Sequence, residues 1–180
     1  MPTETVYGLA VRPYADGVAK IFEIKRRPRE KSVQLLVPDT TWLERLAVPT
    51  AEAAALADAF WPGPLTLVLP ASAQAPGAVV ADGTIGVRVP NHPIALEVLR
   101  RVGPLAASSA NLSGEPAPTT ADDIRSIFGD LVDAYLDGGT IVGTGSTVVD
   151  LTRSAIRVLR EGPISIADVK SAVEGRLGRA

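Results

Sequence analysis

The chain has 180 residues, no cysteine and a formal net charge of −2, with 46% hydrophobic and 4% aromatic residues. This length fits one domain with a sizeable aliphatic core, and the composition excludes disordered and collagen-like classes. The lack of cysteine excludes disulfides, thiolate catalysis and cysteine-ligated zinc, and one histidine cannot form a histidine metal cluster. No apolar run approaches the roughly 18 residues of a membrane span, and no signal-peptide layout opens the chain, so we expect a soluble, cytoplasmic protein.

Helical and strand patterns are interleaved along the first half of the chain, which predicts an α/β or α+β sheet protein. A helix capped by Asp16 should end before Pro28, because the residue before proline avoids helical geometry. Helices should begin at Thr41 and Thr50, and the second should stop at "WPGP". Strands are expected at 33–37, 65–70 and 84–90.

The second half continues this interleaving and shows no internal repeat or dividing linker. Residues 92–102 read as an amphipathic helix, and "PLAAS" reads as a short buried strand. The loop "SANLSGEPAPTT" that follows is rich in Ser, Asn, Gly and Pro, a composition typical of functional loops. Thr120 with Asp123, and Ser165 with Asp168, predict capped helices, the last ending near Leu177. Between them, "STVVDL" and "IRVLRE" alternate as strands.

Positive charge is concentrated in "KIFEIKRRPREK", residues 20–31, which hold six of the eighteen Lys and Arg residues against two glutamates. On its own this stretch is best interpreted as a solvated helix end whose cations complement the helix dipole.

Several familiar sites have no signal. "GTGSTVVD" (143–150) resembles a phosphate loop, but it lacks the Walker A lysine and leads into a strand. No dinucleotide-binding G-x-G-x-x-G follows a strand, and no G-x-S-x-G nucleophile elbow occurs. His92 precedes a proline at a helix start, so we interpret it as a structural cap or surface residue, and not as a catalytic base.

The remaining polar candidates lie on loops and strand ends. Individually each has a structural explanation as a strand former, turn residue or surface cation. Together they suit a ligand with carboxylate and phosphate oxygens, because such oxygens pair with guanidinium forks and short hydroxyl donors. The candidates are Thr3, Thr5, Lys25, Arg27, Lys31, Arg88, Ser108, Asn111, Ser113, Ser146 and Arg160.

Six motifs occur in a characteristic order. They are "PTETVYGLA" (2–10), residues 20–31 with Lys25 and Arg27 as a Lys-x-Arg pair, "WPGPLTLVL" (61–69), "TIGVRVPNHP" (84–93), "AASSANLSGEPAPT" (106–119) and "STVVDLT…IRVLREGPIS" (146–165). With them the chain strongly resembles the YrdC-like family of threonylcarbamoyl-AMP synthases over residues 2 to about 168. The resemblance implies a single YrdC-like domain over residues 1–180, with an open, twisted mixed sheet, flanking helices and a concave basic cavity.

The family resemblance also implies a reaction. L-threonine, bicarbonate and ATP, with Mg²⁺ accompanying the ATP, would form threonylcarbamoyl-AMP and pyrophosphate. The adenylate would then pass to partner proteins that make N6-threonylcarbamoyladenosine in tRNA. This chemistry mainly requires alignment and charge neutralisation, since the N-carboxylate of threonine is already a nucleophile.

Site roles carried over from the family fall into three groups. Lys25 and Arg27 would act in catalysis. The threonine-binding group would contain Thr3, Thr5, Arg88, Ser108 and Ser146. The ATP-binding group would contain Arg27, Lys31, Thr84, Ala110, Asn111, Ser113, Pro118 and Arg160, and no dedicated protein metal site is expected.

Departures from the family and two alternative functions qualify these expectations. Leu36 stands where many relatives carry a histidine near threonine. About two dozen residues that form a helix and a strand usually precede "PTET", and without them we expect Thr3 and Thr5 to be less well anchored and a sheet edge to be exposed. The alternatives are a related carbamoyl-adenylate activity and a non-catalytic module that binds double-stranded RNA or serves ribosome maturation. The net charge and the lack of an aromatic stacking platform weaken the RNA reading.

Overall fold

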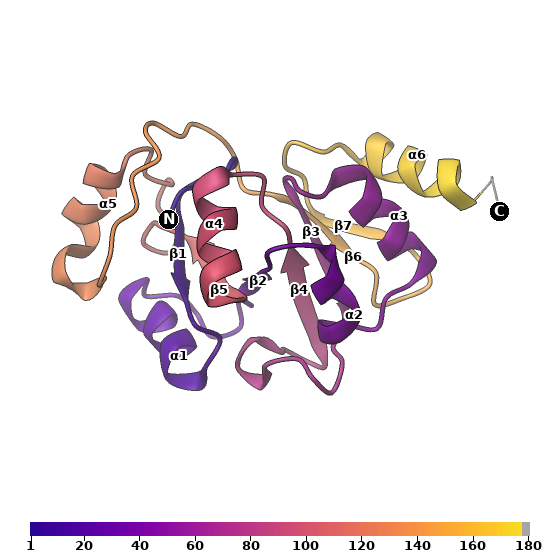
Figure 1. Ribbon diagram of the computed structural model, residues 1–180, viewed down its shortest axis with the longest axis horizontal. Coiled ribbons are helices and arrows are strands. Elements are labelled where there is room, and N and C mark those ends of the chain that lie inside the picture. The colour runs from indigo at the N-terminus through magenta and orange to yellow at the C-terminus, as the bar shows by residue number, and fades with distance from the viewer. Residues whose placement is uncertain (178–180) are drawn as a thin grey trace.

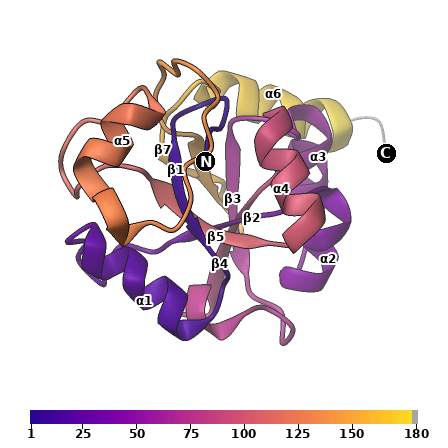
Figure 2. The ribbon, with the colours of Figure 1, turned by 60° about the vertical axis from the view of Figure 1, so that its left-hand side comes forward.

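A computed structural model describes residues 1–177 of the chain. Helices surround a seven-stranded sheet, and the two views agree on this arrangement (Figures 1 and 2). The strands are β1 (Gly8–Val11), β2 (Gln34–Leu36), β3 (Leu65–Pro70), β4 (Thr84–Arg88), β5 (Leu105–Ser109), β6 (Thr147–Asp150) and β7 (Arg157–Arg160). The helices are α1 (Ala15–Ile24), α2 (Leu43–Leu46), α3 (Ala51–Phe60), α4 (Pro93–Val102), α5 (Ala121–Phe128) and α6 (Ile166–Leu177), with 3₁₀ turns η1 (Thr40–Trp42), η2 (Gly77–Val79) and η3 (Gly129–Leu131).

The sheet is mixed, with the strand order β1-β5-β2-β4-β3-β6-β7. The β2–β4 and β3–β6 pairs are parallel, and the other four pairs are antiparallel. Strands that follow one another in the chain are therefore not always adjacent in the sheet; β2, for example, separates β4 from β5. The predicted α/β class with a mixed sheet and flanking helices is confirmed.

Alternate residues of the central strands divide between the core and a cavity, as the two-residue period of a strand requires. The core side includes Leu35, Leu67 and Val87, which pack with residues of α1, α2, α3 and α6. The cavity side includes Thr66 and Gly86. One face of the sheet thus builds the main hydrophobic core, and the other is available for a ligand.

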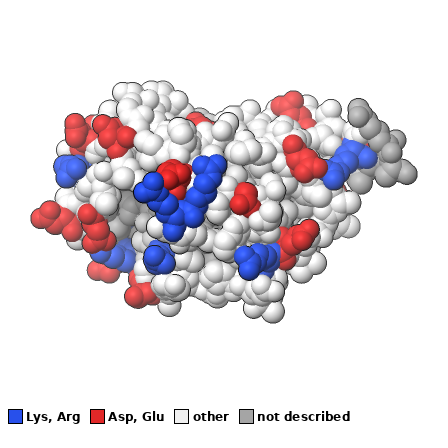
Figure 3. All heavy atoms as spheres, in the orientation of Figure 1, with Lys and Arg blue, Asp and Glu red and all other residues white. Residues whose placement is uncertain are grey.

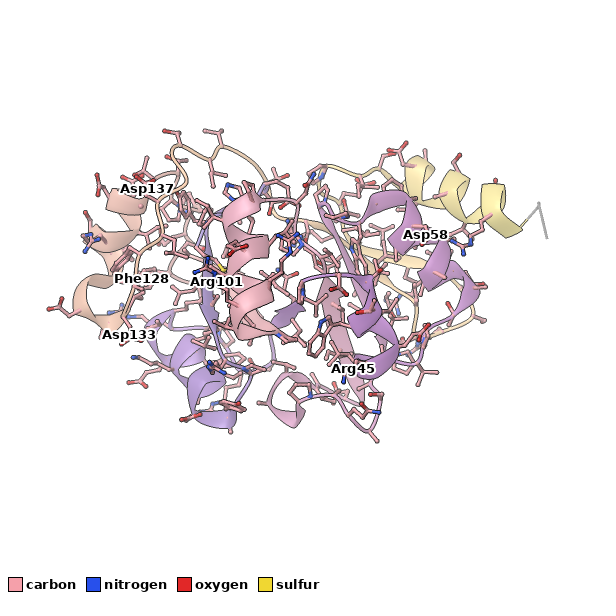
Figure 4. All side chains as sticks on the ribbon, in the orientation of Figure 1. Arg45, Asp58, Arg101, Phe128, Asp133 and Asp137 are labelled. Carbon is pink, nitrogen blue, oxygen red and sulfur yellow. The ribbon has the colours of Figure 1, made fainter. Side chains whose placement is uncertain are left out.

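Two further apolar clusters attach the helices at the β1 end of the sheet. Leu99 of α4 packs against Leu36 and Leu105, and α5 packs with Tyr7 of the N-terminal segment through Phe128. At the opposite end, Asp58 of α3 lies close to α6 (Figure 4) and pairs with Arg176.

Helix starts follow the predicted capping chemistry at three places and differ at two. Thr50, Thr120 and Ser165 accept the expected backbone hydrogen bonds, and Thr120 forms a complete capping box with Asp123. The predictions for Asp16 and Thr41 are wrong. Helix α1 begins at Ala15 after Tyr14, so Asp16 lies in the first turn, and the carboxylate of Asp39 accepts the Thr41 N–H. Because the carboxylate of Asp39 serves as the N-cap, the 3₁₀ turn η1 begins at Thr40, one residue before the predicted helix start.

No helix within residues 1–177 is long and apolar enough to cross a lipid bilayer.

Candidate active site

The cavity on the open face of the sheet has a volume of about 490 Å³. Its floor comes from β2, β4, β3 and β6, and its rim comes from the N-terminal segment, the loop after α1 and the loop before β6. The lining includes three arginines, Arg27, Arg88 and Arg160, together with hydroxyl-bearing side chains. This composition suits an anionic ligand with several oxygens.

Arg88 closes β4 and is 2% exposed. Its Nε donates to the Gly63 carbonyl at 3.1 Å, and its Nη2 donates to Thr5 Oγ1 at 3.0 Å. Glu4 Oε1 lies 2.8 Å from the same Nη2, as a charge contact and not an aligned hydrogen bond. The "WPGP" turn supplies Gly63, where a Cβ would lie 2.3 Å from the Phe60 carbonyl oxygen, so only glycine fits. The guanidinium is therefore fixed before any ligand arrives.

The segment before β1 is folded tightly. Met1 and Gly8 exchange two backbone hydrogen bonds, and the Thr3 and Thr5 hydroxyls are 3.0 Å apart. Both threonines are buried, and the turn is anchored by its own hydrogen bonds and by Arg88. Thr5 lines the cavity, whereas Thr3 bonds the backbone of Val6 and supports the turn.

The end of α1 brings Arg27 to the cavity. The Arg26 N–H bonds to the Glu23 carbonyl and the Arg27 N–H bonds to the Phe22 carbonyl, which together form a Schellman motif. Arg27 then donates from Nε and Nη2 to the carbonyls of Lys31 and Ser32. Lys31 itself is exposed and does not line the cavity.

Arg160 ends β7 and lies against the loop before β6. Its Nε donates to the Ser146 carbonyl at 2.9 Å, and its Nη2 donates to Ser146 Oγ at 3.1 Å. A Cβ on Gly145 would come within 3.0 Å of the guanidinium, so the glycine lets the cation pack onto the loop. The "GTGSTVVD" stretch thus binds the guanidinium of Arg160 and does not form a Walker-type phosphate loop.

The three arginines are close enough to affect one another. Burial lowers the pKa of Arg27 and the charge of Arg160 lowers it further, and Arg160 is affected in the same way by burial and by Arg88. All three remain cationic at neutral pH. Their mutual repulsion is relieved by a bound anion, which favours ligands with several negative charges.

Lys25 occupies a different place from Arg27. It is 1% exposed, and its Nζ donates to the carbonyls of Ser109 and Asn111. The Lys25 carbonyl in turn accepts from the Ser113 N–H. Burial lowers the Lys25 pKa to about 8, and the charge of Arg27 contributes further. Lys25 therefore holds the end of β5 and the loop after it through hydrogen bonds, and it does not line the cavity.

Of the predicted site residues, seven line one cavity: Thr5, Arg27, Thr84, Arg88, Ser108, Ser146 and Arg160. The other seven do not line it: Thr3, Lys25, Lys31, Ala110, Asn111, Ser113 and Pro118. Asn111 holds the loop by donating to the carbonyls of Leu112 and Glu115. The loop residues therefore adjoin the cavity through β5 without forming its wall.

Sequence reasoning missed several polar residues of the lining: Ser32, Gln34, Thr66, Asp82, Ser109, Asp150 and Thr152. Thr66 is hydrogen-bonded to both Gln34 and Ser146, and Asp150 accepts from Thr152. The alternation of "LTLVLP" could have indicated Thr66 as the polar member of a buried strand. The carboxylates of Asp82 and Asp150 give the cavity an acidic part beside its cationic part.

Comparisons with known proteins agree with this fold and site. The chain matches the profile of the Sua5/YciO/YrdC family, described as "Telomere recombination", over residues 1–162. A putative threonylcarbamoyl-AMP synthase of Mycobacterium tuberculosis is 45% identical over 172 residues, covering 92% of this chain and 78% of the relative. The threonylcarbamoyl-AMP synthase of Bacillus subtilis is 39% identical over 178 residues, covering 96% of this chain and 51% of the relative.

Among solved structures, Pyrococcus abyssi Sua5 complexed with L-threonine superimposes with a TM-score of 0.89 at 39% identity. The match covers 95% of this chain and 52% of the Sua5 chain. This chain therefore spans about half the length of the Bacillus and Pyrococcus proteins. It belongs to the Sua5/YciO/YrdC family, and the Mycobacterium and Bacillus relatives above carry the names putative threonylcarbamoyl-AMP synthase and threonylcarbamoyl-AMP synthase.

Proposed function

We propose that this protein is a threonylcarbamoyl-AMP synthase. The observation that carries the proposal is the convergence of three arginines on one cavity that is also lined by short hydroxyl donors. Such a site binds a ligand that has both a carboxylate and phosphates. Family membership and the enzyme names of its relatives support the same conclusion.

In the proposed reaction the threonine amine combines with bicarbonate, losing water, and gives an N-carboxylate. One carboxylate oxygen attacks the α-phosphorus of ATP, and pyrophosphate leaves. Arg88, which Thr5 helps to position, holds the threonine carboxylate, and Arg27 with Arg160 neutralises the phosphates. Positioning and charge stabilisation then account for the rate, because the attacking oxygen needs no further deprotonation.

We assign the divalent ion to the ATP. Among residues 1–177 no three His, Cys, Asp or Glu side chains gather as a metal site, although Asp82 and Asp150 line the cavity. Two carboxylates suit Mg²⁺ that keeps several waters and arrives on the triphosphate. The ion would neutralise phosphate charge alongside the arginines. The unstable adenylate would pass to tRNA threonylcarbamoyl-transfer proteins in the cytoplasm.

A non-catalytic RNA-binding role is less well supported. Over the face shown in Figure 3, Lys and Arg side chains are interspersed with Asp and Glu instead of forming a basic stripe. One of the clustered cations, Lys25, is buried, and its Nζ donates to backbone carbonyls. Nucleic-acid binding through phosphate neutralisation needs free surface cations.

The test is pyrophosphate release by the purified protein with ATP and Mg²⁺. We expect release only when L-threonine and bicarbonate are both present. Release that needs a preformed carbamoyl donor instead of threonine and bicarbonate would indicate a related carbamoyl-adenylate activity. If there is no release and double-stranded RNA binds at moderate salt, the binding-module reading replaces the enzyme.

A further inference from the structure

A row of hydrogen-bonded side chains crosses the cavity floor. Leu35 of β2 lies opposite Val87 of β4, so Gln34 lies beside Gly86. A Cβ on Gly86 would be 3.7 Å from the Gln34 Cβ and 3.5 Å from the Thr66 Cγ2. Because Gly86 has no side chain, Gln34 reaches across β4, and Thr66 Oγ1 donates to its Oε1 at 2.6 Å.

The direction of these hydrogen bonds follows from counting protons. Thr66 has one hydroxyl proton, and it is given to Gln34 Oε1. In the 2.7 Å contact between Ser146 Oγ and Thr66 Oγ1, Ser146 must therefore be the donor. Arg160 Nη2 donates to Ser146 Oγ at 3.1 Å. The relay runs from Arg160 through Ser146 and Thr66 to Gln34, and it leaves Ser146 with no proton for a ligand.

The amide nitrogen of Gln34 is the group that the relay leaves available. Gln34 is half-buried and lines the cavity, and none of the hydrogen bonds found within residues 1–177 uses its Nε2. Fixing Oε1 on Thr66 fixes the plane of the carboxamide and thus directs the two N–H groups. Its neighbour on the same side of β2, Leu36, is apolar and packs with Leu99.

The position of this amide matches one part of the proposed reaction. Arg88 lies on β4 two residues beyond Gly86, and Arg160 lies at the far end of the relay. On its other side, Ser32, two residues before Gln34, accepts from Arg27. Gln34 thus lies near both the arginine assigned to the threonine carboxylate and one assigned to phosphate. The group that joins threonine to the α-phosphorus is the planar carbamate. A neutral, planar donor is suited to its oxygens, whereas phosphates already face guanidinium groups.

We propose that Gln34 is a further substrate-binding residue, whose Nε2 donates to an oxygen of the threonine-derived carbamate and orients it toward the α-phosphorus. This inference rests on the proposed synthase function. The relay from Arg160 holds the amide in place before the substrate forms. The use of bicarbonate therefore depends strongly on Gln34, whereas the binding of ATP depends on it only weakly.

The experiment compares Gln34→Leu and Gln34→Glu with the parent in threonine-dependent pyrophosphate release at varied bicarbonate. Gln34→Leu removes the amide, and Gln34→Glu keeps an acceptor for Thr66 but replaces the donors with a negative charge. We expect kcat/KM for bicarbonate to fall about tenfold or more for Leu and further for Glu, since hydrogen bonds to charged groups are among the strongest. The Kd for ATP should stay within about twofold for Gln34→Leu, because no phosphate contact is lost.

Gln74, exposed on another loop, provides the matched controls Gln74→Leu and Gln74→Glu, which should behave like the parent. Thermal unfolding checks that each variant is folded, and either Gln34 variant alone suffices if the other is not. Bicarbonate kinetics unchanged in a folded Gln34 variant, or a loss confined to ATP affinity, overturns the inference and leaves the synthase proposal standing. A parent that releases no pyrophosphate overturns both.

Discussion

The guanidinium of Arg88 is positioned by the carboxylate of Glu4 and the backbone carbonyl of Gly63. Glu4 approaches Nη2 at 2.8 Å, and the Gly63 carbonyl accepts from Nε. Burial lowers the Arg88 pKa, and the negative charge of Glu4 opposes that shift. Arg27 has no such carboxylate partner within the described residues and is held by backbone carbonyls alone. The two arginines should therefore respond differently to substitution.

Replacing Arg27 should affect activity much more than stability. For Arg27→Ala we expect pyrophosphate release to fall about 100-fold, because a charge that stabilises the transferring phosphoryl group is lost. The free energy of unfolding should change by less than about 1 kcal/mol, since the carbonyls it leaves can bind water. Steady-state kinetics and urea unfolding give both quantities. Arg29→Ala, an exposed change in the same loop, is the control. Parent-like turnover of Arg27→Ala would contradict the site assignment.

Replacing Arg88 should weaken threonine binding more than ATP binding. Calorimetric titration of Arg88→Ala with each ligand measures the two losses. The change also leaves Glu4 beside a buried space without its cation, so the double variant Glu4→Gln with Arg88→Ala separates stability from binding. Arg101→Ala, which removes an exposed ion pair with Glu97, should leave both affinities unchanged. A larger loss of ATP affinity than of threonine affinity would show that the roles are exchanged.

At the scale of elements, the end of α1 positions both Lys25 and Arg27. The Schellman motif needs a residue with positive φ at its turn, and that residue is Arg26, with φ of 50°. A left-handed conformation costs a side-chain-bearing residue roughly 1–2 kcal/mol relative to glycine. The protein thus keeps an arginine at a position that favours glycine.

Arg26→Gly should therefore raise the free energy of unfolding by about 1 kcal/mol, because the strain is removed. Arg29→Gly is the matched control: Arg29 is exposed, without positive φ, and should lose stability or show no gain. Urea unfolding of both variants at pH 7 provides the measurement. If Arg26→Gly destabilised the protein as much as Arg29→Gly does, the result would argue against a positive φ at Arg26.

Lys25 links α1 to the loop after β5 and should make stability depend on pH. Its pKa is lowered from 10.5 to about 8 by burial, so between these values the unfolded chain binds a proton that the folded protein does not. The free energy of unfolding should rise with pH across this window, by an amount on the order of 3 kcal/mol. Below pH 8 Lys25 is protonated in both states, so the cost of burying its charge does not change with pH.

Lys25→Met should abolish that rise, whereas Lys170→Met, at an exposed lysine, should keep it. Urea unfolding measured from pH 8 to 10.5 compares the slopes. Equal slopes for the parent and Lys25→Met would mean that Lys25 keeps its ordinary pKa when folded.

Strands and caps with strong local patterns could be predicted from the sequence, but the contact between Gln34 and Thr66 on the cavity floor could not. The alternation in "LTLVLP" and the Thr120 capping box are local signals, and both elements are observed. Strand β2 has only three residues, too few for an alternation to mark Gln34 as facing the cavity. Gln34 contacts Thr66 across Gly86 of β4, the strand that lies between β2 and β3. This strand order is not encoded in local periodicity.

At the scale of the whole molecule, the net charge of −2 and the cationic cavity are compatible because the arginines are directed inward. The sheet brings Arg27, Arg88 and Arg160 together from three distant parts of the chain. Individually, each could be explained as a surface cation or strand residue. Their common cavity is what turns a resemblance in sequence motifs into a site with defined chemistry.

The most direct test of the proposed synthase activity is the transfer of labelled carbon. The protein would be incubated with ATP, Mg²⁺, L-threonine and ¹³C-bicarbonate, and the products analysed by mass spectrometry. The account predicts threonylcarbamoyl-AMP carrying one ¹³C atom, formed together with pyrophosphate and absent when threonine is omitted. Pyrophosphate release with no label in a threonine-containing adenylate would contradict it.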